Sequence, residues 1–159
     1  MFYKLITHQT GSIEHDKTSK QVYEPFLEVI ADLVAKGKYR KILDFGCGTG
    51  LVGHFLRESF DADKLELTGV DISEQHLEQA KEVMPDLEFI EDSVLSLTKI
   101  PSPEFDVCTF LGTMSIFDEM EDILSNLLRL IKKGGFLYIY DVVNKEPVDM
   151  IMRYRKVGN

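Results

Sequence analysis

Several features are scarce in this chain of 159 residues, and each scarcity excludes a class of protein. The two cysteines, Cys47 and Cys108, are too few for a disulfide framework and lack the spacing of metal ligands, which favours a reducing compartment. Lys and Arg number 18 against 27 Asp and Glu, and the net charge of −9 argues against a nucleic-acid partner, because phosphates need a basic surface. No apolar run approaches the roughly 18 residues of a membrane span, and the apolar stretch at the start is too short for a secretory signal. We therefore expect a cytoplasmic protein with no metal, nucleic-acid or membrane partner.

The length and the 44% hydrophobic content suit one domain with one core. From about residue 40 onward, strand-like pieces alternate with pieces of helical period, which predicts a parallel sheet covered by helices on both faces. The predicted strands are 41–45, 65–70, 87–90, 105–111 and 136–140.

Four helices are predicted between these strands and before them. The first carries an apolar stripe from Val22 to Val34, with Pro25 in its first turn and Gly37 after its end. The second follows Gly50 and buries Leu51, Val52, Phe55 and Leu56. Ser73 caps the third, which runs to about Val83, and Asp118 with Glu121 forms a capping box for the fourth, which ends at the Lys132-Lys133-Gly134-Gly135 sequence.

The predicted strand 136–140 lacks a neighbour on its outer side, because the residues after Tyr140 suffice only for a short helix around 148–155. An apolar edge strand needs pairing or covering. Either the natural chain continues beyond Asn159, which we favour, or a second copy pairs at this edge and forms a homodimer. The single domain then divides into a helical lead-in and lid (1–38), a cofactor-binding core (39–141) and a truncated tail (142–159).

Three alternating glycines follow the first predicted strand, in the sequence Asp44-Phe45-Gly46-Cys47-Gly48-Thr49-Gly50. Glycine permits positive φ and lets the backbone approach a ligand, and the next helix directs its free N–H groups at it. In a parallel sheet such a ligand lies beyond the carboxyl ends of the strands. The other candidate residues follow strand ends too: Asp71, Asp92, and the segment from Phe110 to Thr113.

Spacing separates two cofactors that such a turn could bind. A nicotinamide fingerprint needs its third glycine where Leu51 stands, and it usually has no acid inside the first strand. Here the third glycine is Gly50, and Asp44 is a carboxylate suited to a ligand with an ammonium group.

From about Lys41 to Tyr140 the sequence resembles the class I S-adenosylmethionine-dependent methyltransferases. The resemblance implies a three-layer, doubly wound Rossmann-like sandwich with strand order 3-2-1-4-5, lacking the C-terminal strands six and seven. It places Asp44 and the backbone of Gly46 and Gly48 at the methionine part of the cofactor and Asp71 at the ribose. The remaining implied contacts are Phe45, Cys47 and Gly50 in the turn, Ile72, Asp92 and Ser93 around the adenine, and Phe110 and Leu111 near the methionine ammonium.

Simpler roles stay open for some of these residues. Asp71 could cap a helix, Asp92 could be solvated, and both cysteines most simply pack the core. No catalytic residue is assigned, since His8, His15, Asp118 and Asp141 have no support as a general base.

The expected function is methyl transfer to an oxygen, nitrogen or carbon of a small-molecule acceptor. The Asn/Asp-Pro-Pro-aromatic turn of base- and amide-methylating relatives is replaced here by Leu111-Gly112-Thr113-Met114. The alternatives are a non-catalytic domain of the same fold that binds the cofactor or a partner and, less favoured, a nicotinamide-dependent oxidoreductase.

Overall fold

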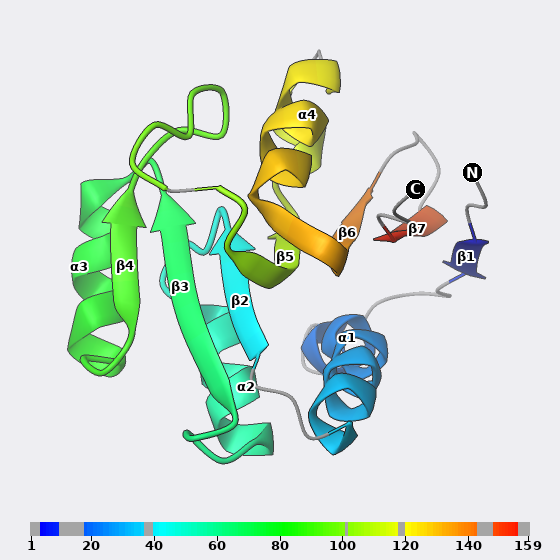
Figure 1. The fold of residues 1–159 in the computed structure, drawn as a ribbon, viewed down its shortest axis with the longest axis horizontal. Coiled ribbons are helices and arrows are strands. Elements are labelled where there is room, and N and C mark those ends of the chain that lie inside the picture. Colours follow the sequence, from blue (N-terminus) through cyan, green and yellow to red (C-terminus); the bar gives the residue numbers. More distant parts are fainter. Residues whose placement is uncertain are drawn as a thin grey trace.

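The computed structural model describes residues 4–9, 18–36, 40–100, 102–117, 120–142 and 148–155 (Figure 1). Seven strands and four α-helices alternate along these segments, with one 3-10 helix, η1. In chain order they are β1 (Lys4–Gln9), α1 (Thr18–Ala35), β2 (Arg40–Phe45), α2 (Leu51–Ser59), β3 (Leu65–Asp71), α3 (Glu74–Val83), β4 (Glu88–Glu91), β5 (Phe105–Leu111), η1 (Met114–Ile116), α4 (Glu121–Leu130), β6 (Ile131–Val142) and β7 (Val148–Arg155).

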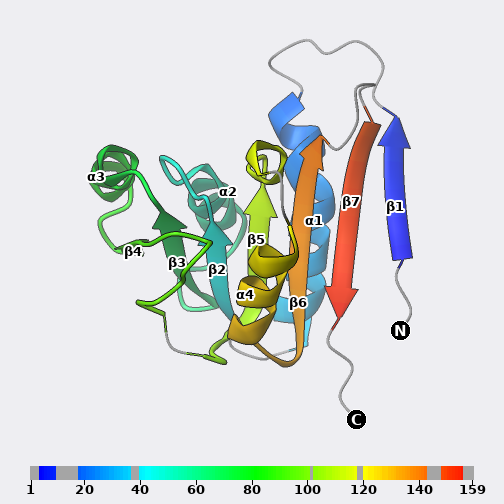
Figure 2. The same ribbon diagram turned by 90° about the horizontal axis from the view of Figure 1, so that it is seen from above.

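The strands form one sheet in the order β1-β7-β6-β5-β2-β3-β4, seen from above in Figure 2. Five neighbouring strands of this sheet are parallel to one another: β6, β5, β2, β3 and β4. They correspond to the five predicted strands, and their spatial order is the predicted 3-2-1-4-5. The α/β fold class and the strand order are therefore confirmed.

Neighbouring residues of β2 belong to two different apolar clusters, which shows that the sheet is buried on both faces. Ile42 packs with Phe26 and Ile30 of α1 and with Val52 and Leu56 of α2. Leu43 packs on the other face, in a cluster that includes three buried residues of α4: Ile123, Leu127 and Leu130. Successive side chains of a strand point to opposite faces, so a continuous apolar run such as this one favours a central strand between two helical layers. The three-layer sandwich follows.

Two strands that the sequence analysis did not expect extend the sheet beyond β6. The segment 148–155, predicted as a short helix, is strand β7 and pairs antiparallel with β6 from Phe136 to Val142. The lead-in, predicted as helical, contains β1, which pairs antiparallel with β7. A run of eight residues is short enough for either structure, and the unpaired edge of β6 decides in favour of a strand. The homodimer was predicted on the ground that the outer side of β6 is unpaired, and β7 already occupies that side.

The helix boundaries differ from the prediction at several residues. Pro25 lies inside α1, which begins at Thr18, whereas Phe26, Ile30 and Leu33 of the predicted stripe are buried as expected. In α2, Leu51 is 48% exposed, because the first residue after the glycine turn faces away from the core.

At α4 the N-cap is Met120 and Glu121 is the first helical residue, so the predicted capping box of Asp118 and Glu121 is wrong, because the helix begins two residues later than that box requires. Asp118 itself lies outside the described residues. This helix ends at Leu130, before the predicted Lys132-Lys133-Gly134-Gly135 stop, because Ile131 is already extended and pairs with Phe105 in the sheet. Gly37 also lies outside the described residues. None of the described helices has the length and apolar character needed to cross a bilayer.

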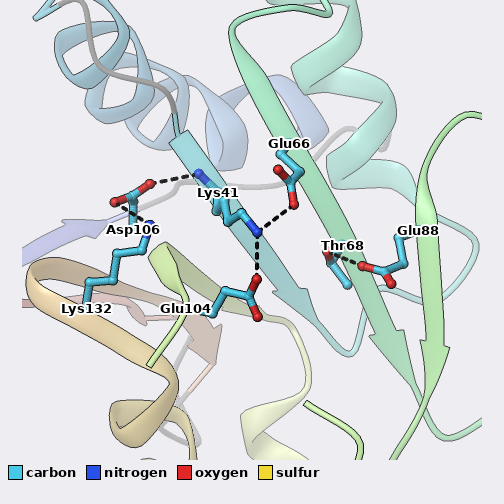
Figure 3. Close-up of polar contacts among 7 residues, drawn as sticks. All are labelled: Lys41, Glu66, Thr68, Glu88, Glu104, Asp106 and Lys132. Carbon is cyan, nitrogen blue, oxygen red and sulfur yellow. Dashed lines mark hydrogen bonds and ion pairs between the residues drawn. The ribbon is translucent and has the colours of Figure 1, made fainter. Parts of the chain in front are cut away.

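A polar network joins the strands near their amino ends, away from the glycine turn (Figure 3). The Nζ of Lys41 lies 2.6 Å from Glu104 and 3.0 Å from Glu66, and these carboxylates raise its pKa, with Glu104 contributing most. The backbone N–H of Lys41 donates to Asp106, whose other oxygen pairs with Lys132. Lys41 thus links β2 to β3 through Glu66 and to β5 through Asp106 and through Glu104, the residue before that strand, and Asp106 links β5 to β6 through Lys132. These contacts support the parallel register.

Candidate functional site

The turns that follow β2, β3, β4 and β5 lie at the same end of the sheet, because these strands are parallel (Figure 1). The glycine turn follows β2, Asp71 ends β3, Asp92 and Ser93 follow β4, and Gly112 follows β5. The structure therefore brings the predicted residues together at the carboxyl ends of the parallel strands, which is where open parallel sheets bind their ligands.

The glycine turn adopts backbone angles that other residues avoid. Gly46, Gly48 and Gly50 have φ of 68°, 53° and 88°. The N–H groups of Gly46 and Cys47 both donate to the carbonyl of Val70, at 2.8 and 3.0 Å, which ties the turn to β3. A Cβ on Gly46 would lie 2.6 Å from the Thr113 hydroxyl, whereas a Cβ on Gly48 would meet no atom within 4 Å. The turn is thus packed closely at Gly46, against Thr113 and Val70, and has open space at Gly48.

Asp44 at the end of β2 carries a buried oxygen that no group of the described residues satisfies. Its side chain is 7% exposed, and Oδ1 accepts a 2.6 Å hydrogen bond from the Thr109 hydroxyl. Oδ2 is buried and accepts none. The pKa of Asp44 is raised to about 7: burial raises it most, the Thr109 hydrogen bond lowers it, and the charge of Asp71 raises it. An unsatisfied buried carboxylate oxygen destabilises a fold unless a ligand supplies the missing donor. A ligand cation fits this position.

Asp71 connects the glycine turn to the start of α3. Its Oδ2 accepts from the Gly48 N–H and its Oδ1 from the Ser73 N–H, both at 2.9 Å. The cap of α3 is Ser73, whose hydroxyl accepts from the His76 N–H. Asp71 is therefore not the helix cap. Each carboxylate oxygen retains a second lone pair, so the ribose contact predicted for Asp71 is compatible with these bonds.

Asp92 organises the loop that follows β4. It is 7% exposed rather than solvated, and its carboxylate accepts from the N–H groups of Ser93 and Lys99, both at 2.8 Å. The Lys99 side chain closes the same loop by donating to the Glu91 carbonyl. The carboxylate faces its own loop, a role that the sequence analysis missed because the main partner lies seven residues away. Its predicted adenine contact stays a prediction.

Both thiols are packing groups. Cys47 and Cys108 are buried, and burial raises the pKa of both, so neither is a reactive thiolate. The sulfur of Cys47 lies 2.9 Å from where Gly69 would carry a Cβ, so any ligand contact of Cys47 comes from its backbone. Within the described segments, no three His, Cys, Asp or Glu side chains gather as metal ligands would.

The aromatic residues of the predicted site are also part of the core. Phe110 is fully buried and packs edge-on against Phe45, with 6.0 Å between ring centroids. These two residues can contact a ligand only through backbone atoms. Leu111 is half-buried, and the adjacent Gly112 has a φ of 67° and open space where its Cβ would be.

Apolar side chains rim the site. The described residues include five large apolar side chains that are strongly exposed, and four of them come from the segments that follow β2 to β5: Leu51 at the start of α2, Ile72, Leu95 and Ile116 at the end of η1. Ile72, predicted to contact the adenine, is 72% exposed. Thr113, the last residue of the predicted segment from Phe110 to Thr113, lies against Gly46 of the glycine turn. Thr109, which donates to Asp44, was not indicated by any motif in the sequence.

Comparison with known proteins finds a family and several relatives for this chain. Residues 43–137 match the family model described as a methyltransferase domain. Over 118 residues the chain is 31% identical to the ubiquinone/menaquinone biosynthesis C-methyltransferase UbiE of Campylobacter jejuni, covering 72% of this chain and 50% of that protein. Over an alignment that is also 118 residues long, it is 35% identical to the trans-aconitate 2-methyltransferase of Rhodopseudomonas palustris, covering 72% of this chain and 43% of that protein.

Among solved structures, the CurJ carbon methyltransferase superposes with a TM-score of 0.74 at 19% identity. The match covers 83% of this chain and 38% of that one. At this identity the likeness speaks for the fold alone. The chain spans about half the length, or less, of the curated relatives that it matches.

Proposed function

The chain belongs to the class I S-adenosylmethionine-dependent methyltransferase family, and from this membership we propose that it transfers the methyl group of that cofactor to a small-molecule acceptor. The observation that carries the proposal is the buried, unsatisfied Oδ2 of Asp44, at the end of the strand that leads into the glycine turn. A carboxylate in that position suits the ammonium group of the cofactor's methionine part.

The residues around Asp44 fit the rest of the cofactor. The backbone from Phe45 through Gly46, Cys47, Gly48 and Gly50 would line the methionine part, and the carboxylate of Asp71 would accept from the ribose hydroxyls. Ile72 would cover one face of the adenine, with Asp92 and the backbone of Ser93 at its edge. The carbonyl groups of Phe110 and Leu111 would face the ammonium group from β5.

The acceptor would lie over the ends of β5 and β6, because the cofactor would occupy the ends of β2, β3 and β4. There Leu111 and Met114 are half-buried and Ile116 is 72% exposed, so this side of the site is apolar. One relative is named as a C-methyltransferase of ubiquinone and menaquinone biosynthesis, and another for methylating trans-aconitate, which is a small molecule. With the net charge of −9, these facts favour a small acceptor over a nucleic acid.

The chain's own contribution to the reaction is to hold and orient. The bound cofactor supplies an activated methyl group on its sulfonium. The protein then needs to align the acceptor with that methyl group and exclude water. No general base is proposed, since Asp141 is buried in β6 and the side chains of His8, His15 and Asp118 lie outside the described ones.

Titration calorimetry tests the cofactor, with S-adenosylhomocysteine and NAD as the two probes. We expect S-adenosylhomocysteine to bind at micromolar concentration and NAD to give no heat. If NAD binds and S-adenosylhomocysteine does not, the oxidoreductase alternative is favoured instead.

Transfer of a radiolabelled methyl group to a panel of quinone precursors and small carboxylic acids tests the reaction itself. Incorporation into any member supports the proposal. Binding of S-adenosylhomocysteine with no incorporation across the panel would favour the non-catalytic alternative.

A further inference from the structure

Thr109 lies beside Asp44 in the centre of the sheet and is not part of any recognised motif. It stands opposite Asp44 in the β2–β5 register and has no exposed surface. Its hydroxyl is 2.6 Å from Oδ1 of Asp44 and 3.4 Å from the Leu43 carbonyl. A threonine hydroxyl carries one proton, and the shorter contact to a charged acceptor is the stronger one. Thr109 therefore donates to Asp44.

This contact makes the two oxygens of Asp44 different. Oδ1 is satisfied by the protein, and Oδ2 is buried without a donor. Holding one oxygen fixes the plane of the carboxylate and leaves the other available to a ligand. The same hydrogen bond favours the charged form of Asp44 and opposes the effects of burial and of Asp71.

We propose that Thr109 is a positioning residue: it holds Asp44 as a carboxylate with Oδ2 presented to the ligand's ammonium group, so that the cofactor binds only the deprotonated form of Asp44. This inference rests on the proposed function, because it needs a cofactor that carries an ammonium group.

Few ionisable groups lie around Asp44. Asp71 of β3 and the thiol of Cys47 interact with it electrostatically, and opposite Asp44 in β3 stands Gly69, which has no side chain. His76 of α3 lies behind Asp71, with 3.7 Å between its Nδ1 and Oδ1 of Asp71. Because histidine can change charge near neutral pH, the test requires a His76→Asn control.

The direction of the pH effect follows from the charge of the ligand. An ammonium group favours the carboxylate form of Asp44, so affinity is full above the pKa of Asp44 in the free protein, about 7, and falls as the pH drops below it. The decline is about tenfold per pH unit while one proton must leave on binding. Thr109→Val removes the donor, raises the pKa of Asp44 further, and moves the decline to higher pH.

The experiment is calorimetric titration with S-adenosylhomocysteine from about pH 5.5 to 8.5 at constant ionic strength. We expect Thr109→Val to shift the midpoint of the affinity curve upward by about one pH unit, which weakens binding about fivefold at pH 7 and about tenfold at the acid end, with a smaller difference at the alkaline end. Thr109→Ser keeps the hydroxyl and should restore the wild-type curve. Asp44→Asn should remove the pH dependence, and His76→Asn should keep the midpoint.

Three outcomes would overturn the inference. A wild-type affinity that is flat over this range excludes the coupling to Asp44. A Thr109→Val loss that is equal at every pH shows a packing defect only, and a Thr109→Ser loss as large as that of Thr109→Val excludes the hydroxyl as the cause. Should Thr109→Val fail to fold, as judged by near-ultraviolet circular dichroism, Thr109→Ala, which also lacks the hydroxyl, takes its place in the same comparisons. A wild-type chain that binds no S-adenosylhomocysteine at any pH would refute the proposed function as well.

Discussion

At the scale of the residue, Asp44 combines an energetic cost to the folded state with the proposed contact to the cofactor. Its buried Oδ2 has no donor within the described protein, so the folded chain carries a partly desolvated carboxyl group without full compensation. Residues arranged in this way are typical of functional sites, where stability is given up for ligand affinity.

Asp44→Asn tests this penalty through the pH dependence of stability. The pKa of Asp44 in the folded protein, about 7, lies above its ordinary value of 3.8, so between these values the folded state holds a proton that the unfolded state has released. Wild-type stability therefore falls as the pH rises through this window, and that loss is complete above pH 7. Asparagine has no such ionisation.

We expect the free energy of unfolding of Asp44→Asn, relative to wild type, to rise between about pH 4.5 and pH 8, by about 1 to 3 kcal/mol. Urea denaturation at both pH values measures it. A difference between the two proteins that does not change with pH would contradict the expectation.

Asp71→Ala tests a residue with two roles. The substitution removes the acceptor of the Gly48 and Ser73 N–H groups and the proposed ribose contact. We expect S-adenosylhomocysteine to bind about 1 to 3 kcal/mol more weakly by calorimetry, together with a lower melting temperature. Glu74→Ala, an exposed acid in the first turn of α3, is the matched control and should leave binding unchanged. Unchanged affinity in Asp71→Ala would leave it with a structural role only.

At the scale of the element, β7 explains how the apolar strand β6 can lie away from a free edge. β6 pairs with β5 on one side and with β7 on the other, and β1 then becomes the outer strand. Because β1 and β7 run antiparallel, β1 points the same way as the five parallel strands (Figure 2). Residues from the two ends of the described chain thus complete one side of the sheet.

Met152→Pro tests this pairing. Met152 stands opposite Ile139 of β6 and Leu5 of β1, and proline lacks the N–H group that a central strand donates. We expect a lower melting temperature and self-association at increasing concentration, measured by sedimentation velocity. The wild-type chain should sediment as a monomer across the same concentrations. A wild-type dimer that dissociates in Met152→Pro would instead place β7 in an intermolecular interface.

At the scale of the whole molecule, the two ends of the parallel sheet have different tasks. The carboxyl ends carry the glycine turn, Asp44 and the apolar rim, whereas the amino ends carry the ion pairs of Lys41 (Figure 3). Stability and ligand affinity should therefore be separable by substitution.

Lys41→Met tests this separation. The variant leaves Glu66 and Glu104 without their shared cation, so their charges repel. We expect a lower melting temperature at low salt, a smaller loss at high salt because screening weakens the ion pairs, and an unchanged affinity for S-adenosylhomocysteine. Differential scanning calorimetry at two salt concentrations measures the first two effects. A loss of affinity would show that the two ends of the sheet are coupled.

Much of this architecture follows from local pattern. The apolar runs at 41–45 and 105–111 suit strands buried on both faces, and Ser73 caps α3 as its position before an acidic first turn predicts. The alternating glycines and Asp44 likewise indicated a turn of positive φ beside a carboxylate. These features depend on residues close together in the chain.

The features that depend on contacts between residues far apart in the chain were decided by the tertiary structure alone. The segment 148–155 became a strand because β6 offered an unpaired edge, and Asp92 turned toward Lys99 because the loop between them closed. Thr109 acquired its role because the sheet register places it opposite Asp44, 65 residues earlier. The sequence by itself determined the five parallel strands and the glycine turn, since these depend on short-range pattern. Only folding decided which oxygen of Asp44 is left for a ligand, because that depends on a hydrogen bond between strands.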